Sequence, residues 1–402
     1  MSRPDDEGRD VERQTGSTGG RSRSLEPARS LWLDSLAGSA EHILADRLSV
    51  SMTDSGTTSV ADERAGDIAV ADLRRPAGGH SGETFHELSV LDDPDHPLVP
   101  DPDHAYIERE VRNGWTDVEL AARFLADEDY ALLLTGETGV GKDRLLAHLS
   151  ARTNRPLVRV NFGSGTTYAD LVGEFAPNSG ADEDRIARVR RLADEHDIGL
   201  GEAAELVGAE HAFEFTPGIL YRAVEQGWTF VADELNAAGP AATMPLHGLT
   251  ERNGQLAVTS TSEVLQPHPE FRFVATMNPP RYAGTSPLND AFRSRFWELE
   301  LDYLSPTAER RLLYETTALQ RGVEHDERVA ERLTELAASL RASYRDRDLA
   351  TPTSHRTVIK IGRLVSEFDM APIAAAKQVF EARATAEDRN AVSKAIESTR
   401  WE

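Results

Sequence analysis

The sequence predicts an α/β fold: a parallel sheet with helices on both faces, followed by a C-terminal helical lid. Between residues 101 and 302, apolar strand-like runs alternate with helical patterns, which is typical of βαβ units. A glycine-rich turn follows the first of these runs and opens a helix. After Tyr303 the strand signals stop, and amphipathic patterns for three to five helices follow. We therefore expect an α/β core over 101–302 and a helical lid over 303–402.

The first hundred residues differ from the rest in composition. Segments such as TGSTGGRSRS and DDPDHPLVPDPD are rich in Gly, Ser, Asp and Pro, and they contain few periodic apolar positions. Such segments cannot bury enough apolar surface to offset the entropy of ordering, so residues 1–100 are expected to form a largely disordered acidic region. One stretch departs from this, because apolar residues recur at helical spacing between Trp32 and Leu48. It either docks on a partner or on the core, or forms only a transient helix.

Four strands and two further features are expected within the core. The strands are the apolar runs ALLLT, RPLVRVNFG, GWTFVADELN and FRFVATMNPP, taken in chain order. A pair of helices is expected as an insert over 181–212, in the middle of the α/β pattern. Asn253 and Gly254 stand between two arms of alternating polar and apolar residues, which predicts a hairpin over 251–266 with its turn at these two residues.

The composition narrows the classes of function. Acidic residues number 68 against 44 basic ones, so the net charge is −24 and a broad positive surface for nucleic acid is not expected. Only four of the basic residues are lysines, and an acid-rich, Lys-poor surface favours adaptation to high salt over an ordinary acidic protein. There are no cysteines, which excludes disulfides and thiolate metal sites. No apolar run approaches the roughly 18 residues of a membrane helix, and no secretory signal is seen, so we expect a cytoplasmic protein without membrane partners.

The glycine-rich turn has the pattern of a phosphate-binding loop. Its backbone N–H groups and the start of the following helix can bind phosphate oxygens, and the lysine adds a positive charge. The strict pattern has Ser or Thr after the lysine as a Mg²⁺ ligand, but here a carboxylate takes that position. A carboxylate can hold Mg²⁺ directly or through water, although it also places a negative charge near the triphosphate. The alternative is a turn that binds nothing. The residues concerned are Gly136, Glu137, Thr138, Gly139, Val140, Gly141, Lys142 and Asp143.

Two strand ends carry polar residues suited to phosphate chemistry. The apolar strand FVA ends in Asp233 and Glu234. Asp233 is the candidate Mg²⁺ ligand, and Glu234 is the candidate general base that polarises the attacking water. Asn278 ends the next strand and can position that water or detect the γ-phosphate, although Asn-Pro-Pro is by itself an ordinary turn.

Three arginines complete the candidate set. Arg293 and Arg295 lie in the segment FRSRF, and either could stabilise negative charge during phosphoryl transfer in a neighbouring subunit. The alternative is a pair of surface arginines beside buried phenylalanines. Arg356 lies in TSHRTV near the start of a lid helix and could reach the γ-phosphate with its planar guanidinium.

These motifs in this order resemble the AAA+ family and, more narrowly, its dynein-related and MoxR branch, which includes NorQ/CbbQ, GvpN and CobS proteins. The resemblance covers about residues 100–370. It is carried by LVRVNFGSGTTYADLVGEF, by FTPGILYRAVEQGWTFVADELNAAGP, and by LQPHPEFRFVATMNPP followed by PLNDAFRSRF. The resemblance implies an ATPase that uses ATP and Mg²⁺ and works as a homo-oligomeric ring, usually a hexamer. It also implies a protein client, often one with a von Willebrand A domain.

The resemblance assigns roles residue by residue. Lys142 corresponds to the phosphate-binding lysine, Asp233 to the Mg²⁺ residue, Glu234 to the base, and Asn278 and Arg356 to the first and second sensors. Arg295 is preferred to Arg293 as the arginine finger, and Asn161 corresponds to a residue that restrains the base. The insert and the hairpin would face a central pore or a partner.

Three other functions stay open alongside a remodelling ATPase. The first is a CobS-like ATPase subunit of a metal chelatase, which RPLVRVN and LQPHPEFRF resemble. The second is a nucleotide-gated scaffold without turnover, which Asp143 alone suggests. The third is a nucleic-acid motor, which the net charge disfavours.

Overall fold

The fold rests on a parallel sheet, as the sequence predicts, but the sheet has five strands where four were expected. The structure, a computed structural model, describes residues 75–101, 106–178, 183–208, 213–279 and 286–401. The strand order across the sheet is β13-β5-β12-β9-β6, and every neighbouring pair is parallel. The strands are β5 (Ala131–Thr135), β6 (Leu157–Asn161), β9 (Thr229–Asp233), β12 (Arg272–Met277) and β13 (Phe296–Glu300).

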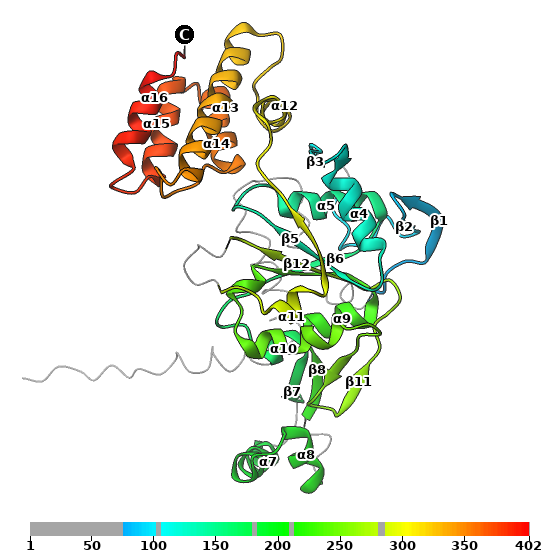
Figure 1. The fold of residues 1–402 in the computed structure, drawn as a ribbon. Helices are drawn as coiled ribbons and strands as arrows, with labels where there is room; N and C mark the ends of the chain where they lie inside the picture. Colours follow the sequence, from blue (N-terminus) through cyan, green and yellow to red (C-terminus); the bar gives the residue numbers. More distant parts are fainter. Residues whose placement is uncertain (1–74, 102–105, 179–182, 209–212, 280–285, 402) are drawn as a thin grey trace, which may run out of the picture. The chain divides into compact units, whose positions relative to one another are not determined.

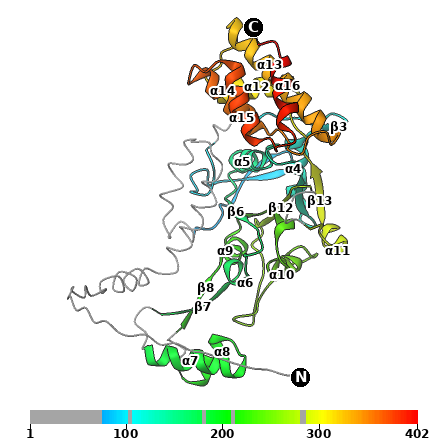
Figure 2. The same cartoon turned by 90° about the vertical axis from the view of Figure 1, so that its left-hand side faces the viewer.

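Helices cover both faces of this sheet, which is why its central strands are apolar on both sides. Successive side chains of β5 point to opposite faces: Leu132 and Leu134 pack with Leu145 of α5, whereas Leu133 joins the core cluster that contains Phe230 of β9. Figures 1 and 2 show α4 and α5 on one side of the strands and α9 and α10 on the other. These helices and two shorter ones are α4 (Asp117–Ala126), α5 (Lys142–Thr153), α6 (Tyr168–Leu171), α9 (Ile219–Gln226), α10 (Pro240–Leu249) and α11 (Asp290–Arg293), with a 3₁₀ turn η3 (Leu235–Ala237).

Residues 75–101 are ordered, contrary to the expectation of a disordered region up to residue 100. They contain an antiparallel hairpin, β1 (His80–Phe85) and β2 (Leu88–Leu91), and a second small pair follows, β3 (Glu110–Arg112) and β4 (Trp115–Thr116). Leu88 is buried with the helices α4 and α5, and Leu98 is buried in the cluster on the other face of the sheet. The burial of these two leucines could not be predicted from the Asp- and Pro-rich composition around them, because the residues they pack against lie far away in the sequence. Residues 1–74, including the helical pattern between Trp32 and Leu48, lie outside the described residues.

The insert between α6 and α9 contains two helices on a β-ribbon. The helices α7 (Glu183–His196) and α8 (Leu200–Leu206) occur within the expected range. They share a small core of their own with Val189, Ala203 and Phe213 among its buried residues. The strands β7 (Gly173–Pro177) and β8 (Phe213–Pro217) pair antiparallel and carry the helices, an element that the sequence analysis did not predict.

The second hairpin exists, but its turn is not where the sequence predicts. Strands β10 (Leu256–Val258) and β11 (Glu263–Leu265) are antiparallel, and the chain reverses between them at 259–262. Asn253, with a φ of 60°, instead lies in the turn that joins α10 to β10. Asn253 supplies left-handed backbone to this turn, but the turn is a helix-to-strand connection.

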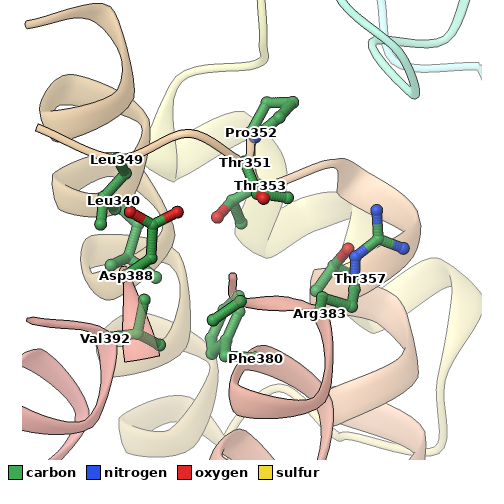
Figure 3. Close-up of a pocket in the computed structure, with 11 residues that line it drawn as sticks. Leu340, Leu349, Thr351, Pro352, Thr353, Thr357, Phe380, Arg383, Asp388 and Val392 are labelled. Carbon is green, nitrogen blue, oxygen red and sulfur yellow. The ribbon is translucent and has the colours of Figure 1, made fainter. Parts of the chain in front are cut away.

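After β13, the regular elements that the structure describes are all α-helices. It has its own apolar core, in which Leu313, Leu333, Val358, Phe380 and Ile396 are buried. A small cavity among its helices is lined by Leu340, Leu349, Phe380, Arg383 and Asp388 with six other lid residues, and by none of the candidate site residues (Figure 3). The helices are α12 (Pro306–Thr316), α13 (Glu324–Arg345), α14 (His355–Ser366), α15 (Pro372–Arg383) and α16 (Arg389–Ser398). In the described part of the chain, every helix is too short or too polar to cross a bilayer.

Candidate nucleotide site

The glycine loop connects β5 to α5, and its shape requires glycine at several positions. Gly136, Gly139 and Gly141 have φ values of 146°, 75° and 104°, which L side chains rarely adopt. A Cβ at Gly136 would lie 2.3 Å from the carbonyl oxygen of Leu301, and one at Gly139 would lie 2.5 Å from the Cβ of Ser354. The loop is therefore closely approached by the chain after β13 and by Ser354, the N-cap residue of the lid helix α14. Its end at Lys142 is the N-terminus of α5, where unpaired N–H groups favour an anion.

Other loop residues are held by contacts with their surroundings. Val140 is buried in the core between the sheet and α5. The carbonyl of Thr138 accepts a hydrogen bond of 3.2 Å from the Tyr303 hydroxyl, and the carbonyl of Glu137 accepts one from the backbone N–H of Val140. These contacts fix the loop from one side.

Lys142 connects the loop to the adjacent strand. Its ammonium is buried and donates hydrogen bonds to the carbonyl of Gly136 at 2.7 Å and to Oδ1 of Asn278 at 2.9 Å. Burial lowers the pKa of Lys142 to about 8, against the opposing effect of three nearby carboxylates. A bound anion would favour the charged form of this lysine again.

Asn278 also contacts the candidate base. Its Nδ2 donates to Oε1 of Glu234 at 2.8 Å, so one amide joins the lysine of the loop to the glutamate at the end of β9. This is possible because β12 lies between β5 and β9 in the sheet, and the carboxyl ends of parallel strands meet at one edge. Glu234 has a φ of 53°, and its backbone N–H donates to the Thr276 hydroxyl at 3.2 Å.

Asp233 lies at the same edge and is held by two residues that the sequence analysis did not single out. The Thr276 hydroxyl donates to Oδ1 of Asp233, and the guanidinium of Arg159 contacts Oδ2. The same Arg159 nitrogen lies 3.2 Å from Oδ1 of Asp143. Burial acts to lower the pKa of Arg159, but Asp143 and Asp233 together raise it. A charged residue in the middle of the apolar strand LVRVN was the signal that could have identified Arg159.

The structure brings Arg356 to this cluster but leaves the two finger candidates outside it. Nη2 of Arg356 lies 3.3 Å from Oδ2 of Asp143. Arg295 donates to the carbonyl of His247 at 2.9 Å and pairs with Glu251 at 3.1 Å. Arg293 forms two hydrogen bonds of 2.6 Å with the carboxylate of Glu298.

Asn161 ends β6 directly beside Asp233 in the sheet register. Its side chain is exposed. Within the described residues, the Glu234 carboxylate accepts a side-chain hydrogen bond from Asn278. Asn278 thus performs in this structure the restraining contact that the resemblance implies for Asn161.

Asp143 and Asp233 fit a Mg²⁺ ion by their chemistry and placement. Both offer carboxylate oxygens, the ligands that Mg²⁺ prefers, and both contact a single cationic nitrogen of Arg159. No group of three or more His, Cys, Asp or Glu side chains gathers as a metal cage in the described segments. Mg²⁺ does not require one, because with nucleotides it takes one or two carboxylates together with phosphate oxygens and water.

Comparisons with known proteins agree with this geometry. The family model described as AAA domain (dynein-related subfamily) matches residues 131–296, which contain four of the five sheet strands and most candidate site residues. The model described as CbbQ/NirQ/NorQ C-terminal matches residues 315–399, within the lid.

Three curated relatives share part of the chain. Protein NorQ of Paracoccus denitrificans (strain Pd 1222) is 30% identical over 234 residues, which is 58% of this chain and 73% of NorQ. Aerobic cobaltochelatase subunit CobS of Sinorhizobium sp is 29% identical over 273 residues, 65% of this chain and 71% of CobS. Midasin of Dictyostelium discoideum is 30% identical over 207 residues, 51% of this chain but only 3% of midasin. With the parallel sheet, the glycine loop and the acidic strand end in place, the chain belongs to the MoxR-like AAA+ ATPases, in the dynein-related subfamily.

Proposed function

We propose that the protein binds ATP with Mg²⁺ at the edge of the sheet and hydrolyses it to ADP and phosphate. The observation that carries this is the chain of hydrogen bonds from Lys142 through Asn278 to Glu234. It supports the proposal because one amide connects the candidate phosphate-binding lysine with the candidate general base, an arrangement suited to an in-line attack of water on the γ-phosphate.

The proposed site residues have three roles: binding the phosphates, holding Mg²⁺ and activating the attacking water. The loop N–H groups and Lys142 bind the phosphates, and Arg356 approaches from the lid. Asp233 and Asp143 hold Mg²⁺, which when bound neutralises charge on the phosphates. Glu234 takes the proton of the attacking water, and its orientation is set by Asn278.

Steady-state phosphate release tests this proposal. Glu234→Gln keeps the shape of the side chain and its acceptor for Asn278 but removes the base. We expect it to bind ATP as tightly as wild type and to lose turnover by at least about 100-fold, the lower range for a general base. Glu315→Gln on the surface of α12 is the matched control and should keep wild-type turnover. Equal rates for wild type and Glu234→Gln would leave a nucleotide-gated scaffold as the function.

We further propose that the active form is a homo-oligomeric ring in which Arg295 of one subunit reaches the ATP of the next. We expect a hexamer, the usual ring size in this family. Neither Arg295 nor Arg293 belongs to the described cluster around Lys142, so a finger role requires a second subunit. Arg295 is preferred because it is 29% exposed and anchored on the backbone of α10, whereas both hydrogen bonds of Arg293 go to one surface glutamate.

The proposed use of this ATPase is to remodel or activate a partner protein, such as one with a von Willebrand A domain. The match of the lid to the CbbQ/NirQ/NorQ C-terminal model supports it over the alternative. The alternative is an ATPase subunit of a metal chelatase, which the similarity to CobS favours. Affinity purification of the tagged protein at high salt distinguishes the two functions. Co-purification of a protein with a von Willebrand A domain supports remodelling, and co-purification of a large chelatase subunit supports the alternative.

The charge balance supports a role in a cytoplasm of high salt. With a net charge of −24, the folded chain repels itself, and salt screens this repulsion. The midpoint of thermal unfolding should therefore rise as KCl is increased, and a midpoint that falls would contradict this part of the proposal.

A further inference from the structure

Arg159 is the one residue of the described cluster that contacts both candidate Mg²⁺ ligands. Its Nη2 pairs with Oδ2 of Asp233 and lies 3.2 Å from Oδ1 of Asp143. The two aspartates come from different elements, the end of β9 and the first turn of α5. A single guanidinium therefore occupies the space between two carboxylates that a divalent cation would bridge.

The sheet register explains how Arg159 reaches this position. In the parallel pair of β6 and β9, Arg159 lies beside Val231, and Asn161 lies beside Asp233. Side chains two residues apart share a face of the sheet, so Arg159, Val231 and Asp233 point to the same side. Val231 packs with the buried leucines of α5, which identifies that side as the one where α5 begins and Asp143 lies.

The carboxylate at position 143 gives Arg159 its second partner. The strict phosphate-loop pattern has Ser or Thr here, and a neutral hydroxyl would form no ion pair with a guanidinium. Asp143 instead pairs with Arg159 and with Arg356 of the lid. The two arginines thus balance the negative charge of Asp143. This balance explains how the site could tolerate a carboxylate beside bound phosphates.

We propose that Arg159 is a resident counter-ion that holds Asp143 and Asp233 together in the nucleotide-free protein, and that a divalent cation must compete with it for these carboxylates. The proposal rests on the proposed function in assigning these aspartates to Mg²⁺. Its consequence is that the site without nucleotide binds free divalent cations weakly. The ion enters with the triphosphate, whose oxygens supply the additional ligands.

Titration of the nucleotide-free protein with Mn²⁺, followed by the electron paramagnetic resonance signal of free Mn²⁺, tests this directly. Mn²⁺ prefers the same oxygen ligands as Mg²⁺ and reports binding without any turnover. In Arg159→Gln the two carboxylates lose their shared cation, so we expect Mn²⁺ to bind at least about tenfold more tightly than in wild type. KCl is kept constant and high so that the acidic surface contributes equally in all variants.

Arg311→Gln is the matched control, because Arg311 pairs with Glu315 on the surface of α12. It should change the Mn²⁺ affinity by less than about threefold, since this exposed ion pair involves neither aspartate. Adding Asp233→Asn to Arg159→Gln should return the affinity to the wild-type value. Arg159→Met, which removes the positive charge but keeps a long side chain, covers the case in which the glutamine variant does not fold and should show the same gain in Mn²⁺ affinity.

Unchanged or weaker Mn²⁺ binding in folded Arg159→Gln would overturn the proposal. So would a gain in affinity that persists after Asp233→Asn. Because no ATP is present, these outcomes are separate from failure of the proposed function. A protein that does not hydrolyse ATP could still show the tenfold gain, and an active ATPase could lack it.

Discussion

Asn278 is the residue on which the candidate site depends most. A side-chain amide offers both an acceptor and donors, so it can bind an ammonium with its oxygen and a carboxylate with its nitrogen. Here it does both, at 2.9 Å from Lys142 and 2.8 Å from Glu234, and its backbone carbonyl accepts a hydrogen bond from Asn236. The base and the phosphate-binding lysine are therefore positioned by one buried side chain.

The first prediction concerns this amide. Asn278→Asp keeps an acceptor for Lys142 but places a second carboxylate against Glu234, so the base loses its donor and is repelled. We expect the rate of phosphate release to fall by about 100-fold, the usual effect of a displaced catalytic group. The affinity for ATP should fall as well, because the new carboxylate also lies near the γ-phosphate. Asn390→Ala, at an exposed position on α16, is the control. A variant that keeps a third or more of the wild-type rate would show that Asn278 does not position the base.

At the scale of elements, the lid is organised around a buried ionic cluster. Glu309 of α12 binds Arg341 of α13 through two hydrogen bonds of 2.8 and 2.6 Å, and it contacts Nδ1 of His355 at 2.5 Å. The Arg341 guanidinium lies 4.2 Å from the ring centre of Tyr303, whose hydroxyl reaches the glycine loop at Thr138. The cluster thus links three lid helices to the loop that binds phosphate.

The second prediction is that Glu309 stabilises the lid strongly. In Glu309→Gln the guanidinium of Arg341, only 4% exposed, loses its counter-charge. We expect the free energy of unfolding to fall by about 3–5 kcal/mol, the usual cost of breaking a buried ion pair from one side. Glu331→Gln removes a half-exposed partner of Arg310 and should cost less than about 1 kcal/mol. Urea denaturation followed by circular dichroism measures both, and equal losses would contradict the assignment.

The third prediction is a pH dependence of stability that comes from His355. Its Nε2 accepts the N–H of Leu304 at 3.2 Å, so the neutral ring with its proton on Nδ1 satisfies both neighbours. Burial lowers the pKa of His355 below its usual 6.5, although Glu309 opposes this. Below pH 6.5 the unfolded chain then binds a proton that the folded chain does not, so stability falls as the pH falls.

The measurement is the free energy of unfolding of wild type and His355→Gln between pH 7.5 and about 5, the window below the unperturbed pKa. The variant should be less stable at neutral pH, yet its stability should decline less steeply with acid. Parallel declines in the two proteins would mean that other groups cause the pH dependence. Glu309 adds a separate loss at lower pH, because the hydrogen bonds from His355 and Arg341 outweigh burial and lower its pKa below 4.5.

The elements also show what the sequence can and cannot reveal. The four predicted strands are present because each contains an apolar run, which in LVRVN is interrupted by Arg159, and the central strands are buried on both faces. The fifth, β13, was missed because only Phe296 and Leu299 of FWELE are buried at the sheet's edge. The ribbon of β7 and β8 was missed because its strands pair across the 35 residues, 178–212, that separate them.

The same limit applies within the site. Lys142, Asp233, Glu234 and Asn278 could be found because each has a fixed place after a strand. Arg159 and Thr276 lie inside strands, and only the register of neighbouring strands brings them to Asp233. No local pattern could have specified that contact.

At the scale of the whole molecule, the proposed ring makes a prediction that needs two variants. Glu234→Gln and Arg295→Ala are each expected to lose turnover alone. If Arg295 acts in trans, a co-expressed mixture contains interfaces with an intact Glu234 on one subunit and an intact arginine on the next, so activity should return in part. Arg293→Ala in place of Arg295→Ala is the control and should be active by itself. A mixture that is as inactive as its components would contradict an arginine supplied by the neighbour.

The central claim is that one triphosphate lies between the glycine loop and the acidic end of β9. A crystal structure of Glu234→Gln with Mg²⁺ and ATP tests it most directly. We expect the γ-phosphate within hydrogen-bonding distance of Lys142 and Asn278, with Mg²⁺ between the phosphates and Asp233. A triphosphate bound elsewhere, or a site that stays empty at saturating ATP, would contradict the claim.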